Sequence, residues 1–198
     1  MPAIVLVRHA ATTWSGKRYC GRADPALSAA GRRGAAALAE ELAPALPTGI
    51  RILSSPSRRA AQTAAAIAGR LPDPAPIELD ERWLETDVGL AEGLTFDQVA
   101  ERFPAFADAL ATGIASIDWP GGETAADLER RITGAWAAVL ATGRPTLVVS
   151  HAGSIRVAIA LATGRRPDEV PFPDVAAWSR HEIAMTDVAA TATPSVTS

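Results

Sequence analysis

An apolar segment that ends abruptly in arginine and histidine is the feature that most constrains the fold. Residues 4–7 are Ile-Val-Leu-Val, and Arg8 and His9 follow directly. Four apolar, mostly β-branched residues in a row predict a strand buried on both faces. Arginine and histidine are costly to remove from water unless they are paired. Because open α/β sheets bind ligands at the carboxyl ends of their strands, this segment predicts a ligand site at one edge of a sheet.

Two further short apolar segments are also followed directly by polar residues. Residues 51–53 are followed by a Ser-Ser-Pro-Ser run and then by Arg58 and Arg59, and residues 146–149 are followed by a serine and His151. If these strands are parallel, their guanidinium and imidazole groups converge at one edge. Such a cluster, without a matching number of acids, predicts a pocket for an anion with several oxygens, of which phosphate is the usual one.

Segments with helical spacing of apolar residues separate the expected strands. This alternation predicts a three-layer α/β/α sandwich with a mainly parallel sheet. Ser55 is expected to cap one helix, with Pro56 at its first position. The other expected helices are 28–43, 95–103, 105–110, 154–162 and a long one after the turn at 120–124, and the remaining expected strands are 77–79 and an edge strand at 175–183.

Composition restricts the class of protein and of partner. The net charge is −3 and no block of Lys and Arg stands out, which argues against a nucleic-acid partner. Cys20 is the only cysteine, which excludes a disulfide scaffold and suits a cytoplasmic location. No signal peptide or membrane-spanning run is visible. We expect one domain over residues 1–188, a disordered tail at 189–198, and a monomer or homodimer.

Four ordered blocks resemble the histidine phosphatase superfamily, in particular its phosphoglycerate mutase-like branch. Residues 8–12, Arg-His-Ala-Ala-Thr, are similar to the family signature Arg-His-Gly-x-Thr. Residues 54–64 resemble the second block, residues 84–93 resemble the loop that carries an acid, and residues 149–156 resemble the block with a second histidine. The resemblance implies a phosphoglycerate mutase-like fold.

The resemblance also implies a role for each matching residue. His9 would attack phosphorus and form a phosphohistidine, while Arg8, Arg59 and His151 would hold the phosphoryl oxygens. Glu85 would protonate the leaving alkoxide and then accept a proton from water. No metal and no cofactor is implied. The expected partner is a small phosphorylated metabolite.

The register of the motifs selects among neighbouring candidates. It favours Arg59 over Arg58, because the functional arginine of the family directly precedes an alanine. For the acid it favours Glu85 over the nearby carboxylates, which are Glu81, Asp87 and Glu92.

Several positions depart from the family pattern or have a less definite role. Ser15 stands where asparagine commonly contacts phosphate, and a serine offers a single hydroxyl donor. Ala10 and Ala152 stand where the family has glycine. Ser15, Gly21 and Ala152 are further candidates for the phosphate pocket, with Arg22 beside Gly21 as an alternative at its mouth.

Three other functions remain open at this point. A phosphoglycerate mutase would use the same groups, but mutases of this type resemble longer chains with extra segments over the site, so hydrolysis is favoured. A non-catalytic binder of phosphorylated ligands would need only the cradle. A zinc site on His9 and His151 is disfavoured, because Arg8 and Arg59 would repel the cation.

Overall fold

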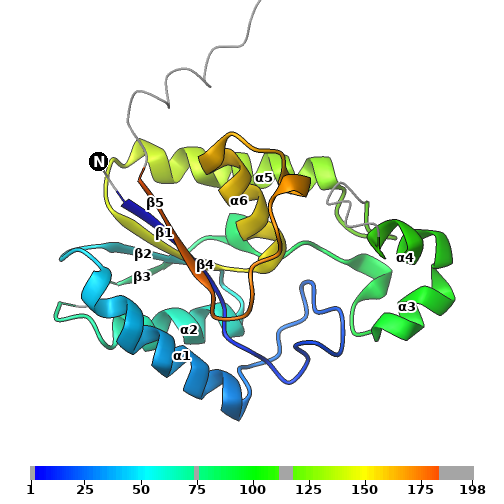
Figure 1. Cartoon of the computed structure of the whole chain (residues 1–198), viewed down its shortest axis with the longest axis horizontal. Coiled ribbons are helices and arrows are strands. Elements are labelled where there is room, and N and C mark those ends of the chain that lie inside the picture. Colours follow the sequence, from blue (N-terminus) through cyan, green and yellow to red (C-terminus); the bar gives the residue numbers. More distant parts are fainter. Residues whose placement is uncertain (1–2, 74–75, 112–117, 183–198) are drawn as a thin grey trace, which may run out of the picture.

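The computed structural model places a five-stranded sheet at the centre of the molecule (Figure 1). It describes residues 3–73, 76–111 and 118–182. The strand order is β3–β2–β4–β1–β5, in which only β5 runs antiparallel to its neighbour. The strands are β1 (Ala3–Arg8), β2 (Arg51–Ser54), β3 (Ile77–Leu79), β4 (Thr146–Ser150) and β5 (Trp178–Glu182).

Alternate residues of β1 face two separate apolar layers. Ile4 and Leu6 pack into the core that contains α5 and α6, whereas Val5 and Val7 pack into the core that contains α1 and α2. Figure 1 shows these two pairs of helices on opposite sides of the sheet. The expected three-layer sandwich with a mainly parallel sheet is therefore confirmed. The four helices are α1 (Ala29–Leu42), α2 (Arg58–Ala68), α5 (Ala125–Ala141) and α6 (Ala152–Thr163).

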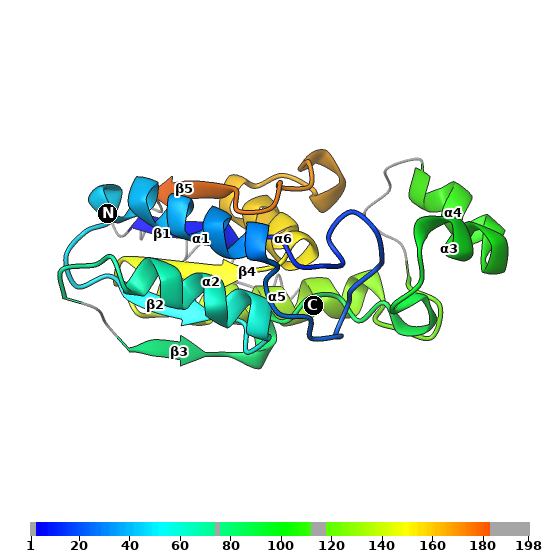
Figure 2. The ribbon, with the colours of Figure 1, turned by 90° about the horizontal axis from the view of Figure 1, so that it is seen from below.

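Two short helices, α3 (Phe96–Arg102) and α4 (Pro104–Ala111), lie outside the three layers. Figure 2 shows them on the side of the molecule toward which the arrows of β2 and β3 point. A small apolar cluster of Val88, Ala91 and Val99 joins them to the preceding loop. The carboxyl ends of the parallel strands therefore face a space bounded by α3 and α4. Single 3-10 turns occur at Ala43–Ala45, Glu81–Trp83, Gly89–Ala91 and Pro167–Glu169.

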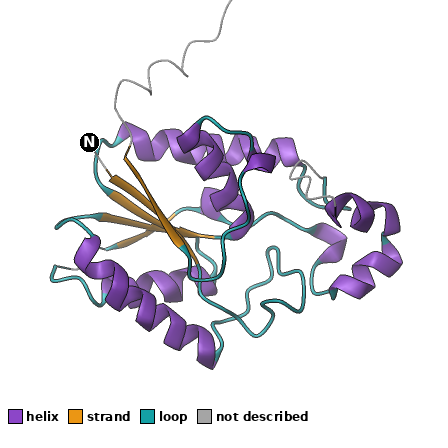
Figure 3. Ribbon diagram, viewed as in Figure 1, coloured by secondary structure: helices purple, strands orange, loops and turns teal. Residues whose placement is uncertain are grey.

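A long loop connects β1 to α1 and contains no helix or strand of its own (Figure 3). Thr12 pairs with Leu27 across the base of the loop, and Arg18 pairs with Thr95 at the start of α3. The loop ends at Ser28, whose side chain accepts a hydrogen bond from the backbone N–H of Gly31 at 2.9 Å. The helix therefore begins where the sequence predicts, directly after Ser28. The cap satisfies one of the backbone N–H groups that have no partner within the first turn.

The expected cap of α2 is wrong. The helix begins at Arg58, so Ser57 and not Ser55 is the residue before it, and Pro56 lies outside the helix. The Ser55 hydroxyl hydrogen-bonds His151 Nε2 at 2.8 Å and also accepts from the backbone N–H of Ser57 at 3.4 Å, before the helix begins. Asp24 caps the helix from the long loop, because its carboxylate accepts from the backbone N–H of Arg58 at 2.6 Å.

Two other boundaries differ from expectation. Helix α6 begins at Ala152, two residues earlier than expected, with His151 as the residue before it. The edge strand is shorter than 175–183, because Ala176 has a left-handed φ of 58° and forms a turn before β5. Residue 183 and the expected tail at 189–198 lie outside the described residues. Within the described ranges, no helix has the length and apolar character needed to cross a membrane.

Two glycines of α1 provide a matched test of how this helix packs. A Cβ at Gly31 would overlap the carbonyl oxygen of Ala11, whereas a Cβ at Gly34 would meet no atom within 4 Å. We expect Gly31→Ala to lower the free energy of unfolding by about 1–3 kcal/mol through overpacking. Gly34→Ala should raise it by up to about 1 kcal/mol through helix propensity.

Urea unfolding of both variants measures the two changes. Equal effects would mean that α1 does not approach the loop after β1 as closely as described.

Candidate active site

A cavity of about 490 Å³ opens at the carboxyl ends of the parallel strands. Arg8 at the end of β1, the adjacent His9, and Arg59 in the first turn of α2 line its inner part. Glu85 lines it from the loop before α3. The convergence that the strand ends predict is therefore present in the structure.

Hydrogen bonding determines the tautomer of His9. Its Nδ1 lies 2.8 Å from the carbonyl oxygen of Ala10. Because a carbonyl oxygen can only accept, Nδ1 carries the proton, and the lone pair is on Nε2. The backbone N–H of Ala10 in turn donates to the Thr63 hydroxyl at 3.0 Å, which helps to fix this peptide. The ring is thus oriented with one unprotonated nitrogen.

The charge state of His9 follows from its surroundings. Its pKa is lowered to about 3, chiefly by burial and then by repulsion from Arg59; the hydrogen bond to the Ala10 carbonyl opposes this, and Arg8 lowers the pKa further. A neutral imidazole is the form that can act as a nucleophile. His9 therefore has both the tautomer and the protonation state that nucleophilic attack requires.

His151 is fully buried and does not reach the surface of the cavity. Its ring centroid lies 5.1 Å from that of His9, in an edge-on arrangement. Its Nε2 lies 2.8 Å from the Ser55 hydroxyl and 3.2 Å from the Ser57 hydroxyl. Burial holds the pKa of His151 well below its usual value, and Arg59, His9 and Arg8 lower it further. Both imidazoles are therefore neutral at pH 7.

The two arginines supply the positive charge of the inner cavity. Arg59 is buried and donates to the carbonyl oxygens of Ala23 at 2.6 Å and Gly21 at 2.9 Å. Arg8 donates to the carbonyl oxygen of Pro173 at 2.6 Å. Burial lowers the pKa of Arg8, while attraction to Glu85 opposes this effect.

Four buried nitrogens beside this cavity have no hydrogen-bond partner among the described residues. They are Arg8 Nε, Arg59 Nε and Arg156 Nη1, from arginines that line the cavity, and His151 Nδ1, from the ring that packs against His9. Leaving a buried donor unpaired costs about 1–3 kcal/mol, more for a charged group. Arg8 and Arg59 are close enough to repel each other, and their unpaired guanidinium nitrogens are donors suited to an oxyanion.

Glu85 is held at the amino-terminal end of α6. Its Oε1 accepts from the backbone N–H of Thr86 at 2.9 Å and from that of Gly153 at 3.2 Å. A Cβ at Gly153 would come within 2.7 Å of Glu85 Oε1, so a larger residue there would displace the carboxylate from this position. Arg131 and Ser154 both donate to the carbonyl oxygen of Leu84, at 2.9 and 2.6 Å, and so fix the residue before the acid.

The structure distinguishes between neighbouring residues that were alternative candidates for the same role. Arg59 lines the cavity, whereas Arg58 is exposed and does not. Of the four nearby carboxylates, Glu85 lines the cavity and the other three do not, namely Glu81, Asp87 and Glu92.

The less definite candidates also reach the cavity. Ser15, Gly21 and Ala152 all line it, but Arg22 points to Glu123, at 3.8 Å. The Ser15 hydroxyl accepts from the backbone N–H of Thr12 at 2.9 Å, so it also supports its own loop. Gly21 has a φ of 47° and lies so close to Val88 that a Cβ would be 2.5 Å from its methyl group.

Sequence reasoning missed four residues that support the site. Ser55 and Ser57 hydrogen-bond His151, and they carry a signal, because they follow β2 as His9 and His151 follow their strands. Thr63 and Arg131 carry no such signal, because their partners, Ala10 and Leu84, are distant in sequence.

Comparisons with known proteins agree with this arrangement. The family model of the histidine phosphatase superfamily (branch 1) matches residues 4–191. A bifunctional protein of Mycobacterium tuberculosis is 37% identical over 163 residues, which cover 80% of this chain and 43% of that protein. The chain thus spans less than half the length of this relative.

Two further relatives match over most of their length. A glucosyl-3-phosphoglycerate phosphatase of Mycolicibacterium vanbaalenii is 33% identical over 187 residues, which cover 85% of this chain and 77% of that protein. The solved structure of a mycobacterial glucosyl-3-phosphoglycerate phosphatase complexed with VO3 superposes with a TM-score of 0.81. It is 29% identical, and the match covers 91% of this chain and 92% of the other.

The lowered pKa of His9 predicts a pH-dependent stability. Between pH 6.5 and about 3 the unfolded state binds a proton at His9 that the folded state does not. The free energy of unfolding should therefore fall on acidification, by about 1.4 kcal/mol per pH unit for this histidine. His9→Asn removes that contribution.

Denaturant unfolding at pH 6, 5 and 4 gives the free energy of unfolding of the wild type and of His9→Asn. Both proteins carry the same carboxylates, so the difference between them isolates the contribution of His9. Parallel curves for the wild type and His9→Asn would show that His9 is not buried in its neutral form.

Proposed function

The chain belongs to branch 1 of the histidine phosphatase superfamily, and from this we propose that it hydrolyses small-molecule phosphomonoesters through a phosphohistidine on His9. The family and the names of its relatives support phosphatase or mutase-type activity. One observation carries the finer proposal. A neutral imidazole with its lone pair on Nε2 lies beside the positive charges of Arg8 and Arg59, whose Nε atoms have no partner among the described residues.

In the first step His9 Nε2 attacks phosphorus in line with the leaving oxygen. The P–N bond forms as the P–O bond to the alcohol breaks, and Glu85 gives its proton to the departing oxygen. Arg8 and Arg59 stabilise the negative charge spread over the phosphoryl oxygens, and the buried His151 packs against the ring of His9. The products of this step are the free alcohol and the phosphohistidine.

In the second step water attacks the phosphohistidine. Glu85, now a carboxylate, takes a proton from that water as the new P–O bond forms and the P–N bond breaks. Inorganic phosphate leaves, and His9 returns to its neutral form with the proton still on Nδ1. The hydrogen bond to the Ala10 carbonyl keeps the same tautomer throughout the cycle.

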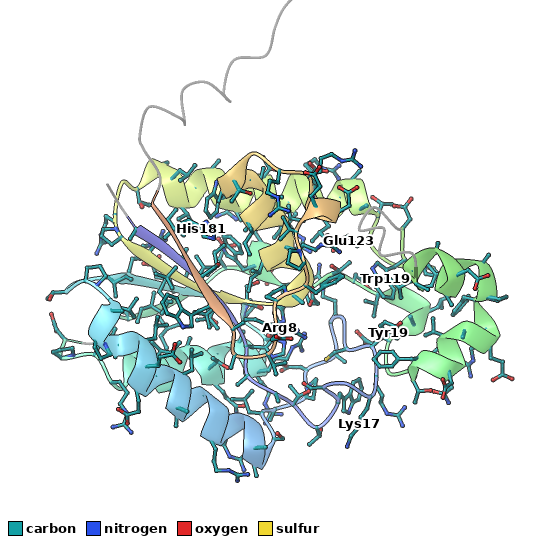
Figure 4. The ribbon with its side chains drawn as sticks, viewed as in Figure 1. Arg8, Lys17, Tyr19, Trp119, Glu123 and His181 are labelled. Carbon is teal, nitrogen blue, oxygen red and sulfur yellow. The ribbon has the colours of Figure 1, made fainter. Side chains whose placement is uncertain are left out.

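A substitution of the nucleophile tests the proposal. His9→Ala should lower kcat for any accepted phosphomonoester by at least about 1,000-fold, because no other group replaces the attacking nitrogen. Phosphate release is measured in parallel with His181→Ala, since His181 lies on β5 away from Arg8 (Figure 4) and does not line the cavity. The control should retain wild-type turnover.

The same assay separates hydrolysis from mutase activity. Phosphate release is followed with and without added bisphosphoglycerate, and an alkali-quenched sample is searched for phosphohistidine at His9. A strict need for the bisphosphate without net release of phosphate would favour the mutase. Turnover by His9→Ala would overturn the proposed nucleophile.

The role of Glu85 predicts a dependence on the leaving group. Glu85→Gln should slow the hydrolysis of alkyl phosphates by about 100- to 10,000-fold, because their alkoxides need a proton as they leave. p-Nitrophenyl phosphate has a good leaving group that needs no proton, so its rate of hydrolysis should fall much less. Glu81→Gln serves as the control, since Glu81 is exposed and outside the cavity.

Initial rates on both substrates give the comparison. An equal loss on the two substrates would show that Glu85 does not act as the proton donor.

A further inference from the structure

The cavity is much larger than the phosphate cradle at its inner end. Its volume of about 490 Å³ lies within the range of about 300–1,000 Å³ that is usual for sites of whole small molecules. The outer part must therefore hold the alcohol portion of the substrate. The chemistry of its walls indicates what kind of alcohol this is.

Aromatic side chains dominate the outer wall. Half of the ten aromatic residues of the chain line this cavity, and they come from separate segments: Trp14, Tyr19, Phe96, Trp119 and Phe172. Tyr19 contacts two of the others edge-on, with its ring centroid 5.0 Å from that of Phe96 and 5.3 Å from that of Trp119. Figure 4 shows Tyr19 and Trp119 between Arg8 and helices α3 and α4.

Core packing alone does not account for this wall. The side chains of Phe96 and Phe172 are 49% and 58% exposed, although both line the cavity. The Arg156 guanidinium lies 4.3 Å above the centre of the Phe172 ring. That arginine is itself fixed by donating to the carbonyl oxygens of Val170 and Asp168. Phe172 is thus held at the mouth by a rigid partner while one part of it faces solvent.

The wall offers few partners to a sugar. Of the described lining residues, Glu85 alone carries a carboxylate, and its proposed role is in the chemistry. The sequence contains no asparagine, and neither of its glutamines, Gln62 and Gln98, lines the cavity. Several other polar side chains of the lining already bond to the protein: Arg18 and Arg156 donate to backbone carbonyl oxygens, the Ser15 hydroxyl accepts from Thr12, and the Thr86 hydroxyl donates to Glu85. A polyhydroxylated alcohol would therefore compete for groups that are in use, and each hydroxyl left unpaired costs free energy.

We propose that the preferred substrates are phosphomonoesters whose alcohol carries an aromatic ring system. This inference rests on the proposed function, because it names the substrate class of the same site. The ring packs against Tyr19, Phe96 and Trp119 by offset or edge-on contacts while the phosphate lies between Arg8 and Arg59.

A series of primary-alcohol esters tests the inference, because their leaving oxygens are chemically similar. The series is ethyl phosphate, 2-phenylethyl phosphate, 2-(1-naphthyl)ethyl phosphate and glucose 6-phosphate. We expect kcat/KM to rise by about 10-fold or more from the ethyl to the naphthylethyl ester as apolar area is buried. Glucose 6-phosphate should not exceed ethyl phosphate.

The outcomes separate the two proposals. Hydrolysis of ethyl phosphate and glucose 6-phosphate at rates equal to or above those of the aromatic esters would overturn the substrate class and leave the phosphatase activity standing. Hydrolysis of none of them would overturn the proposed function. Titration calorimetry with ethylphosphonate and 2-(1-naphthyl)ethylphosphonate, which cannot be hydrolysed, then still decides the substrate class, since about 10-fold tighter binding of the aromatic compound is expected.

A substitution of Phe96 tests whether the preference for aromatic esters arises from the aromatic outer wall of the cavity. Phe96→Ala should lower the ratio of kcat/KM for the naphthylethyl ester to that for ethyl phosphate by about 5-fold or more. Leu79→Ala is the matched control, because Leu79 on β3 is also apolar, is 60% exposed and does not line the cavity. An unchanged ratio in Phe96→Ala would remove this residue from the site of the aromatic ring.

Discussion

The parallel pairing of β1 with β4 is the constraint on which the site depends. Arg8 lies opposite Ser150 in this ladder, and the backbone N–H of His9 donates to the carbonyl oxygen of Ser150 at 2.9 Å. The next residues of the two strands are therefore neighbours, and their rings lie 5.1 Å apart although they come from opposite ends of the described chain. A shift of this register by one residue would turn one of the two histidines to the other face of the sheet.

Burial gives the histidines and the arginines different charges in the same small volume. Desolvation and the nearby guanidinium groups lower the pKa of both imidazoles, so the positive charge resides on Arg8 and Arg59. The proposed nucleophile, His9, and its proposed electrostatic support are thereby kept on separate side chains. A bound anion would offset the charge of the two arginines and so reduce their effect on the pKa of both imidazoles.

The layers of the fold and the inner site were predictable because they depend on local patterns. The β-branched run before Arg8 and the apolar spacing of the helices are enough to predict the sandwich. The positions of the strand ends are enough to predict that His9 and His151 lie together. The supporting contacts were not predictable, because they join distant segments. Ser55 looks like a helix cap in sequence, yet its hydroxyl bonds His151, and Asp24 from another loop caps α2.

The position of α3 and α4 outside the sandwich has an evolutionary consequence. The proposed phosphate-binding groups lie at the strand ends and at the start of α2, whereas Phe96 of α3, Leu110 of α4 and the nearby Trp119 contribute to the outer wall. Mutation or replacement of that appendage can alter what the cavity admits while the strand ends stay intact. The architecture is therefore suited to diversification, in which related proteins come to bind different molecules while the groups at the strand ends are retained.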